Sequence, residues 1–185
     1  SFEIGGEYGS ELVAIKGSYY NTQWQDRNLT KSVSTGQGSS GDTDIIFLRG
    51  VNQKHQGLEV ETKVKPNDMV ELDFIASFGN WKFDGDAEGT YQENEYNDEG
   101  QVVGYTTTEY QYALNGLYVG DMPQTSYIVG LTVKPVKGLR LQALYKTYDK
   151  NYSDWSPSAR EYDGTTDDAD RAQVWEAPGY SKLDL

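Results

Sequence analysis

The sequence predicts an all-β fold: about seven antiparallel strands of a transmembrane β-barrel, joined alternately by short turns and long loops. Three observations lead to this prediction. Apolar and polar side chains alternate along several segments, and the links between those segments are alternately very short and about 30 to 40 residues long. Large aromatic residues also gather at the segment ends nearest the long links. Only 36% of the 185 residues are hydrophobic, although 15 are tyrosine and 20 are glycine, so an ordinary packed globule is a poor explanation.

The expected strands follow from the period-two alternation, because successive side chains of a strand point to opposite faces of its sheet. The pattern is sharpest at residues 56–64, where Leu58, Val60, Thr62 and Val64 oppose Glu59, Glu61 and Lys63. In chain order, the expected strands are residues 1–8, 12–24, 56–64, 69–83, 125–133, 139–148 and 179–185.

Each expected strand has one apolar face, which we predict to contact lipid, and one polar face, which we predict to line the lumen of the barrel. The lipid-facing side of 69–83 carries Val70, Leu72, Phe74, Ala76 and Phe78. The charged residues assigned to the lumenal face are Glu59, Glu61, Lys63, Glu71, Asp73, Arg140 and Lys146.

The links support the same topology. The short links at 9–11, 65–68 and 134–138 contain Gly, Pro and Asn, which suit tight turns. The long links at 25–53, 84–122 and 149–178 are polar. Outer-membrane barrels have short turns on the periplasmic side and long extracellular loops. The aromatic residues beside the long links are interpreted as an interfacial girdle: Tyr19, Tyr20, Trp24, Phe78, Trp81, Phe83, Tyr145, Tyr148, Tyr152 and Trp155.

Composition excludes several function classes. A net charge of −13 disfavours binding to nucleic acid. The chain has no cysteine, so disulfides and thiolate chemistry are excluded, and its single histidine, His55, excludes a histidine-rich metal site. The sequence contains no run of 18 apolar residues, so a membrane-spanning helix is excluded. No spacing of Ser, His and Asp marks a nucleophile, so we expect no enzyme activity.

One acidic segment has the spacing of a calcium loop. Asp84, Asp86, Glu88 and Glu95 occupy positions 1, 3, 5 and 12, with glycine at position 6, which matches an EF-hand loop except for the glutamate at position 5. The flanking helices of an EF-hand are missing, and a solvated acidic hairpin with its turn at 97–100 is the simpler alternative. A second acidic cluster, with a weaker case for cation binding, comprises Asp163, Asp167, Asp168 and Asp170.

Several segments resemble the C-terminal part of the barrel of TonB-dependent receptors, particularly those of Bacteroidetes-type bacteria. Each match is short, but their order and spacing together cover most of the chain. They are the segments 50–57 (GVNQKHQG), 77–82 (SFGNWK), 119–125 (VGDMPQT), 148–154 (YDKNYSD) and 175–180 (WEAPGY).

This resemblance implies an outer-membrane receptor with a plugged, 22-stranded barrel, which takes up a scarce ligand by active transport. The implied partners are outer-membrane lipid, the remainder of the barrel, the plug, the TonB complex and, in some members, a surface lipoprotein that acts as a lid. About seven strands cannot close such a barrel, so we expect residues 1–185 to be part of one barrel domain whose plug and other strands lie outside this sequence.

Two alternatives stay open at this point. The first is a soluble extracellular β-sandwich that binds glycans through loop aromatics, which would need interior faces on two sheets. The second is a small barrel complete in itself, which the odd number of expected strands disfavours because single-chain bacterial barrels close with an even number.

Overall fold

The computed structural model describes residues 1–34, 43–162 and 170–185, which form an antiparallel all-β fold. Eleven strands belong to one sheet, and a 3-10 turn (η1, Pro157–Ala159) is the only helical segment in the described residues. None of the described helical residues is part of a segment long and apolar enough to cross a membrane.

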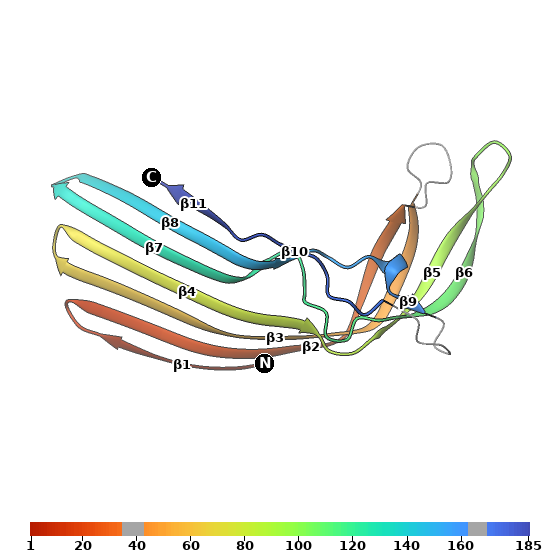
Figure 1. Cartoon of the computed structure of the whole chain (residues 1–185), viewed down its shortest axis with the longest axis horizontal. Coiled ribbons are helices and arrows are strands. Elements are labelled where there is room, and N and C mark those ends of the chain that lie inside the picture. Colours follow the sequence, from red (N-terminus) through yellow and green to blue (C-terminus); the bar gives the residue numbers. More distant parts are fainter. Residues whose placement is uncertain (35–42, 163–169) are drawn as a thin grey trace.

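Seven strands lie side by side along the length of the molecule, each antiparallel to the next (Figure 1). We call them the strand panel. In spatial order they are β1 (Phe2–Gly9), β2 (Val13–Ser34), β3 (Thr43–Asn67), β4 (Val70–Phe83), β7 (Pro123–Val136), β8 (Leu139–Tyr152) and β11 (Tyr180–Asp184). These are the seven strands expected from the alternation. The panel is an open sheet, because within the described chain β1 pairs only with β2 and β11 only with β8.

The short turns lie together at one end of the panel, at the left of Figure 1. In the turn between β3 and β4, the side-chain oxygen of Asn67 accepts hydrogen bonds from the backbone N–H groups of Met69 (2.9 Å) and Val70 (3.0 Å). In the turn between β7 and β8, Gly138 has a φ of +89°, a conformation that side chains disfavour. The turn chemistry expected from the sequence is therefore present.

Two of the three predicted long loops prove to be largely β structure. β2 and β3 continue past the panel as a paired extension, with register shifts between Trp24 and Leu29. A further hairpin, β5 (Ala87–Tyr96) and β6 (Val102–Tyr112), is added to this extension through β5. The prediction of loops failed here because strands rich in polar residues such as Thr, Tyr and Gln also pair in a sheet when its faces are exposed to water. In the described residues of the third link, 149–162 and 170–178, the regular structure after the end of β8 consists of η1 and the two-residue strands β9 (Glu161–Tyr162) and β10 (Glu176–Ala177).

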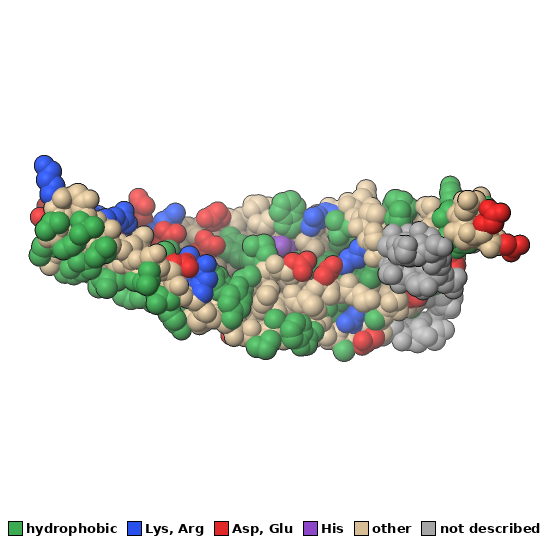
Figure 2. Space-filling model, turned by 90° about the horizontal axis from the view of Figure 1, so that it is seen from above, with side chains coloured by type: hydrophobic (Ala, Val, Ile, Leu, Met, Phe, Trp, Pro, Cys, Tyr) green, Lys and Arg blue, Asp and Glu red, His purple; other side chains and the backbone are tan. Residues whose placement is uncertain are grey.

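The register brings the apolar face of every panel strand to the same side. Val60 of β3 lies opposite Gly17 of β2 and Ala76 of β4, and Ala76 lies opposite Tyr127 of β7. The side chains on this face are exposed, since Phe74, Val129 and Leu131 have exposed fractions of 42–44%. Figure 2 shows hydrophobic side chains along the lower left flank of the molecule and charged side chains above them. The panel therefore has an apolar face that no described residue covers.

The hydrophobic core lies at the end of the panel opposite the short turns, where β2 and β3 extend beyond the other strands, at the right of Figure 1. We call this part the outer cap. Its buried side chains come from segments far apart in the sequence: Ile46, Leu48, Val51, Phe83, Ala87, Tyr112, Leu114, Leu117, Tyr152, Trp155 and Val174. The ring of Trp155 packs at 6.4 Å from that of Phe83 and at 5.9 Å from that of Tyr112, measured between centroids.

Candidate functional site

The polar face of the panel carries charged side chains that pair with one another. Lys63 contacts Glu71 at 3.0 Å and Asp73 at 3.3 Å. Glu71 is only 9% exposed and also faces Lys65 at 3.7 Å and Lys134 at 3.9 Å. Burial of a carboxylate is costly unless it is paired and hydrogen-bonded, and these three lysines meet that need. This cluster of charges on the polar face is thus paired internally.

The register agrees with the predicted face of each charged residue. Glu59 and Glu61 lie opposite Ser18 and Lys16 of β2. On β8, Lys146 forms an ion pair of 2.8 Å with Asp184 of β11. Leu139 and Leu141 lie opposite Val136 and Val133 of β7 on the apolar face, so Arg140, which lies between them in the chain, points to the polar face. All seven charged residues predicted to share one face of the sheet do so.

A group of aromatic side chains lies across three strands on this polar face, near the outer cap. We call Tyr20, His55 and Trp81 the aromatic platform. The indole Nε1 of Trp81 donates a hydrogen bond of 2.8 Å to the hydroxyl of Tyr20. His55 and Trp81 are opposite each other in the register, and their rings stack with centroids 5.3 Å apart and planes 12° apart.

Two glycines make room for the platform. A Cβ atom on Gly57 would lie 2.4 Å from the Tyr20 hydroxyl oxygen, and one on Gly79 would lie 2.9 Å from Nε1 of Trp81. The two rings therefore lie over backbone that has no side chain. Gln124 holds the backbone of Trp81, since its Oε1 accepts from the Trp81 N–H (2.8 Å) and its Nε2 donates to the Trp81 carbonyl (3.1 Å).

The platform corrects the predicted girdle. Tyr20 and Trp81 are on the polar face, whereas Tyr19, Phe78 and Tyr145 are on the apolar face with exposed fractions of 38%, 40% and 52%. The physical reason is the period of two: neighbours such as Tyr19 and Tyr20 must point to opposite sides. Others of the ten aromatics, including Phe83 and Trp155, are buried in the outer cap.

The structure does not bring the four residues of the predicted calcium loop together. Glu88 and Glu95 both lie on the extended strand β5, about 23 Å apart at about 3.3 Å per residue. Glu88 faces Arg49 at 3.7 Å, and Glu95 accepts a hydrogen bond from the Thr106 hydroxyl. No group of three or more potential metal ligands occurs within the described residues. Since a strand cannot curl its side chains around one ion, we propose no calcium site. Of the second acidic cluster, Asp163, Asp167 and Asp168 lie outside the described residues.

Asp86 has a different role from the predicted one, because it joins separate segments of the outer cap. It accepts hydrogen bonds from Arg171 Nη2 (2.8 Å), the Tyr162 hydroxyl (2.9 Å) and the backbone N–H of Asn115 (2.9 Å). Burial opposes ionisation of Asp86, but these hydrogen bonds outweigh it and lower the pKa of the carboxyl below its usual 3.8. Asp84, by contrast, is exposed, and its backbone N–H binds the carbonyl of Asn52.

We expect Asp86→Asn to loosen the outer cap by about 1 kcal/mol, a hydrogen-bond contribution reduced by solvent screening because Arg171 is partly exposed. Because the folded pKa is lowered, the stabilisation is present above the unfolded pKa and is lost as pH falls through the folded value. Acid titration followed by tryptophan fluorescence measures this loss. Asp98→Asn, in the exposed turn between β5 and β6, is the control and should leave the acid transition unchanged. An unaltered transition in Asp86→Asn would contradict the assigned role.

The fold and its two faces define the class: an open, single-sheet antiparallel β protein with one apolar and one charged face. Comparison with known proteins found no matching family model, no similar curated protein and no similar solved structure.

Proposed function

We propose that this chain forms part of a transmembrane β-barrel in a bacterial outer membrane, as a segment of a receptor that takes up a scarce ligand by TonB-coupled active transport. In this proposal the apolar face of the panel contacts lipid, and the charged face lines the lumen against the plug. The short turns face the periplasm, and the outer cap lies on the extracellular side.

The observation that carries the membrane part of the proposal is the uncovered apolar face. It extends over seven strands in one continuous register and includes exposed side chains on every one of them, among them Ile4, Ile15, Leu58, Phe74, Leu131, Leu141 and Leu183. Soluble monomers rarely expose apolar patches larger than a few hundred Å². In the strands of outer-membrane barrels, apolar side chains that point outward alternate with polar side chains that point inward.

The open edges of the panel support a larger sheet. The outer edges of β1 and β11 have no strand partner within the described residues. Unpaired backbone groups are not tolerated within lipid, so spanning sheets are closed. Further strands are therefore required on both sides. The transport function itself is proposed on the resemblance of the five segments to TonB-dependent receptors.

The sandwich alternative has less support. A β-sandwich buries the inner faces of two sheets against each other. All eleven strands described here belong to one sheet, and the apolar side chains of the panel contact no second layer. We therefore do not retain soluble glycan binding as a second function.

Lipid contact can be tested one residue at a time, because the chain has no cysteine and single cysteines give no background. Phe74 and Ile75 are adjacent, similarly exposed (42% and 36%) and on opposite faces. In the receptor in lipid vesicles, we expect brominated lipid to quench a bimane label strongly on Phe74→Cys and weakly on Ile75→Cys. Equal quenching at both positions would contradict the assignment of the faces.

A further inference from the structure

The β5–β6 hairpin ends in a free strand edge. β6 pairs with β5 from Val102 to Tyr112, with a register shift at Val103. On its other side, among the described residues, only Gln111 and Tyr112 have partners, in β9. Within the described residues, the outer edge of β6 from Val102 to Tyr110 pairs with no strand. The hairpin projects away from the panel at the right of Figure 1. Among the residues that the structure describes, the outer edge of β6 is therefore open over this segment, and its backbone is regular from Gly104 to Tyr110.

This edge has few of the features that normally prevent pairing with another chain; its one irregularity is a register shift at Val103, near the tip of the hairpin. Natural edge strands are blunted by lysine, proline, bulges or short length. The segment 102–110 (VVGYTTTEY) has no lysine and no proline, and its only charged residue is Glu109. It is rich in Val, Thr and Tyr, which favour strands. Val103 and Tyr105 are 65% and 62% exposed. Such an edge suits β-augmentation, in which main-chain hydrogen bonds hold an added strand.

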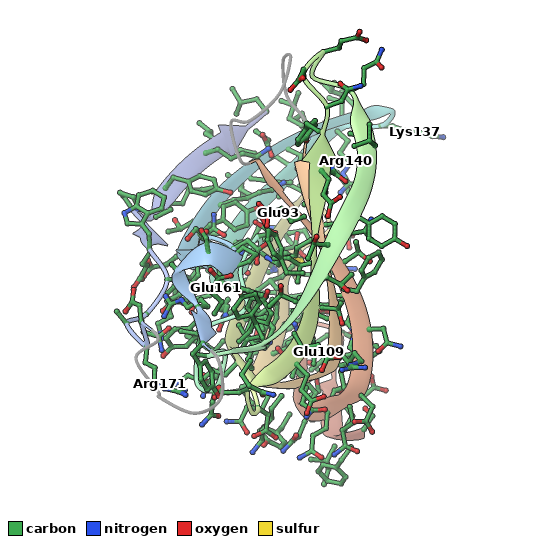
Figure 3. The ribbon with its side chains drawn as sticks, turned by 90° about the vertical axis from the view of Figure 1, so that its right-hand side faces the viewer. Glu93, Glu109, Lys137, Arg140, Glu161 and Arg171 are labelled. Carbon is green, nitrogen blue, oxygen red and sulfur yellow. The ribbon has the colours of Figure 1, made fainter. Side chains whose placement is uncertain are left out.

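The charge of the hairpin indicates what kind of strand it accepts. Residues 87–112 contain no Lys or Arg, and their carboxylates are Glu88, Glu93, Glu95, Asp98, Glu99 and Glu109. Arg49 of β3 neutralises part of this charge at the base, at 3.7 Å from Glu88 and 3.3 Å from Glu109. Figure 3 shows Glu93 and Glu109 along the hairpin. The charge towards the tip is not balanced in this way, which favours a basic partner.

We propose that the free edge of β6 over Val102–Tyr110 accepts an extended basic segment of a partner protein as an additional strand. Backbone pairing supplies the attachment, and the carboxylates of the hairpin select for Lys or Arg on the added segment. A second copy of this hairpin is a poor partner, because two hairpins that both carry carboxylates and no Lys or Arg repel each other. The inference does not depend on the proposed function, since it concerns the hairpin alone and holds whatever covers the panel.

A synthetic peptide tests the edge directly. The probe is a fluorescein-labelled nonapeptide in which Lys alternates with Val and Thr, and binding to the full chain is measured by fluorescence anisotropy. Two matched peptides serve as controls: one has Glu in place of Lys, and the other has N-methyl groups on alternate amides. We expect both controls to bind at least about tenfold more weakly than the basic probe. Added salt should weaken binding of the basic probe, because the exposed charges are screened.

Paired proline variants locate the binding edge. Adjacent residues of a strand direct their N–H groups to opposite edges. Of the two variants Thr106→Pro and Thr107→Pro, one therefore removes a donor that points to β5, and the other removes a donor that points to the free edge. The variant that affects the free edge should bind the basic probe at least about tenfold more weakly while its β content is unchanged by circular dichroism. The other should disturb the β5–β6 pairing itself. The proposal is overturned if the acidic probe binds as well as the basic one, or if both proline variants bind the probe like the unmodified chain.

The nature of the partner is tested in cells with a photo-crosslinking residue at Tyr105. We expect crosslinks to a protein, and we expect the basic nonapeptide to compete with them. Crosslinks to short peptides alone would overturn the assignment to a partner protein, and crosslinks that the nonapeptide does not reduce would overturn the assignment to the edge.

Discussion

On the proposed membrane location, we expect a chain carrying Val60→Arg to insert into outer-membrane lipid much less efficiently than one carrying Glu61→Arg. Val60 lies at the middle of the apolar face, opposite Gly17 and Ala76, and Glu61 lies on the polar face opposite Lys16. An arginine on the lipid face of a barrel costs about 2 to 4 kcal/mol at the bilayer midplane. On the polar face, the same arginine remains among charged groups. The expected difference is a large decrease in the fraction of folded, protease-resistant chains in vesicles, seen only for Val60→Arg.

The two variants control for each other. They place the same side chain at neighbouring positions of one strand, although the net charge changes by +1 in Val60→Arg and by +2 in Glu61→Arg. The larger change in charge is therefore made at the position that we expect to tolerate arginine. Heat-modifiable migration on gels reports folded barrel in the same samples. Equal folding yields for Val60→Arg and Glu61→Arg would count against the membrane proposal as a whole, since only lipid contact distinguishes the two faces so strongly.

Trp155→Ala should have the second large effect, because it removes the centre of the outer cap. Trp155 is 4% exposed and contacts the rings of Phe83 and Tyr112. Lys31 Nζ lies 4.1 Å from the centroid of its indole ring and also donates to its backbone carbonyl. Truncating a buried tryptophan to alanine costs about 3 to 5 kcal/mol. Hydrogen exchange should therefore become faster in the cap segments around Leu48, Leu114 and Val174, whereas the panel keeps its protection.

Trp175→Ala is the matched control for this prediction. Trp175 is twenty residues along the same link and is 66% exposed, so its loss leaves no cavity. Surface substitutions of this kind usually change stability by less than about 0.5 kcal/mol. If amide hydrogen exchange in Trp155→Ala became faster in the panel as well as in the cap, the two parts would unfold together. Equal effects of Trp155→Ala and Trp175→Ala on exchange would contradict the described core.

The strand panel was predictable from sequence because its signal is local. Period-two alternation defines which residues share a face, and turns such as that after Asn67 fix where a strand ends. The same rule shows why the girdle prediction was wrong in part, since Tyr19 and Tyr20 cannot share a face. The paired extensions of β2 and β3 were missed because they alternate weakly, and the run Ile45–Leu48 has no polar residue that would reveal its period.

The candidate site was much less predictable. Asp86 was selected for its spacing to other carboxylates, yet the partner that lowers its pKa is Arg171, 85 residues further along the chain. No local pattern encodes such a contact. The aromatic platform had a usable signal once strands are aligned, because Tyr20, Gly57 and Gly79 form one row across three strands. A large ring beside glycines in the same row indicates that the ring lies over the glycine backbone.

The position of the hydrophobic core in the outer cap has a thermodynamic consequence. The cap derives its stability from its own buried side chains, whereas the panel exposes its apolar face and depends on whatever medium surrounds it. One sequence therefore contains two parts that respond to different variables. We expect denaturant and temperature to act on the cap through its core. On the proposed membrane location, lipid or detergent composition acts on the panel through its apolar surface. Such a chain has no single free energy of unfolding, and its melting curve in different detergents should contain one transition that stays fixed and one that moves.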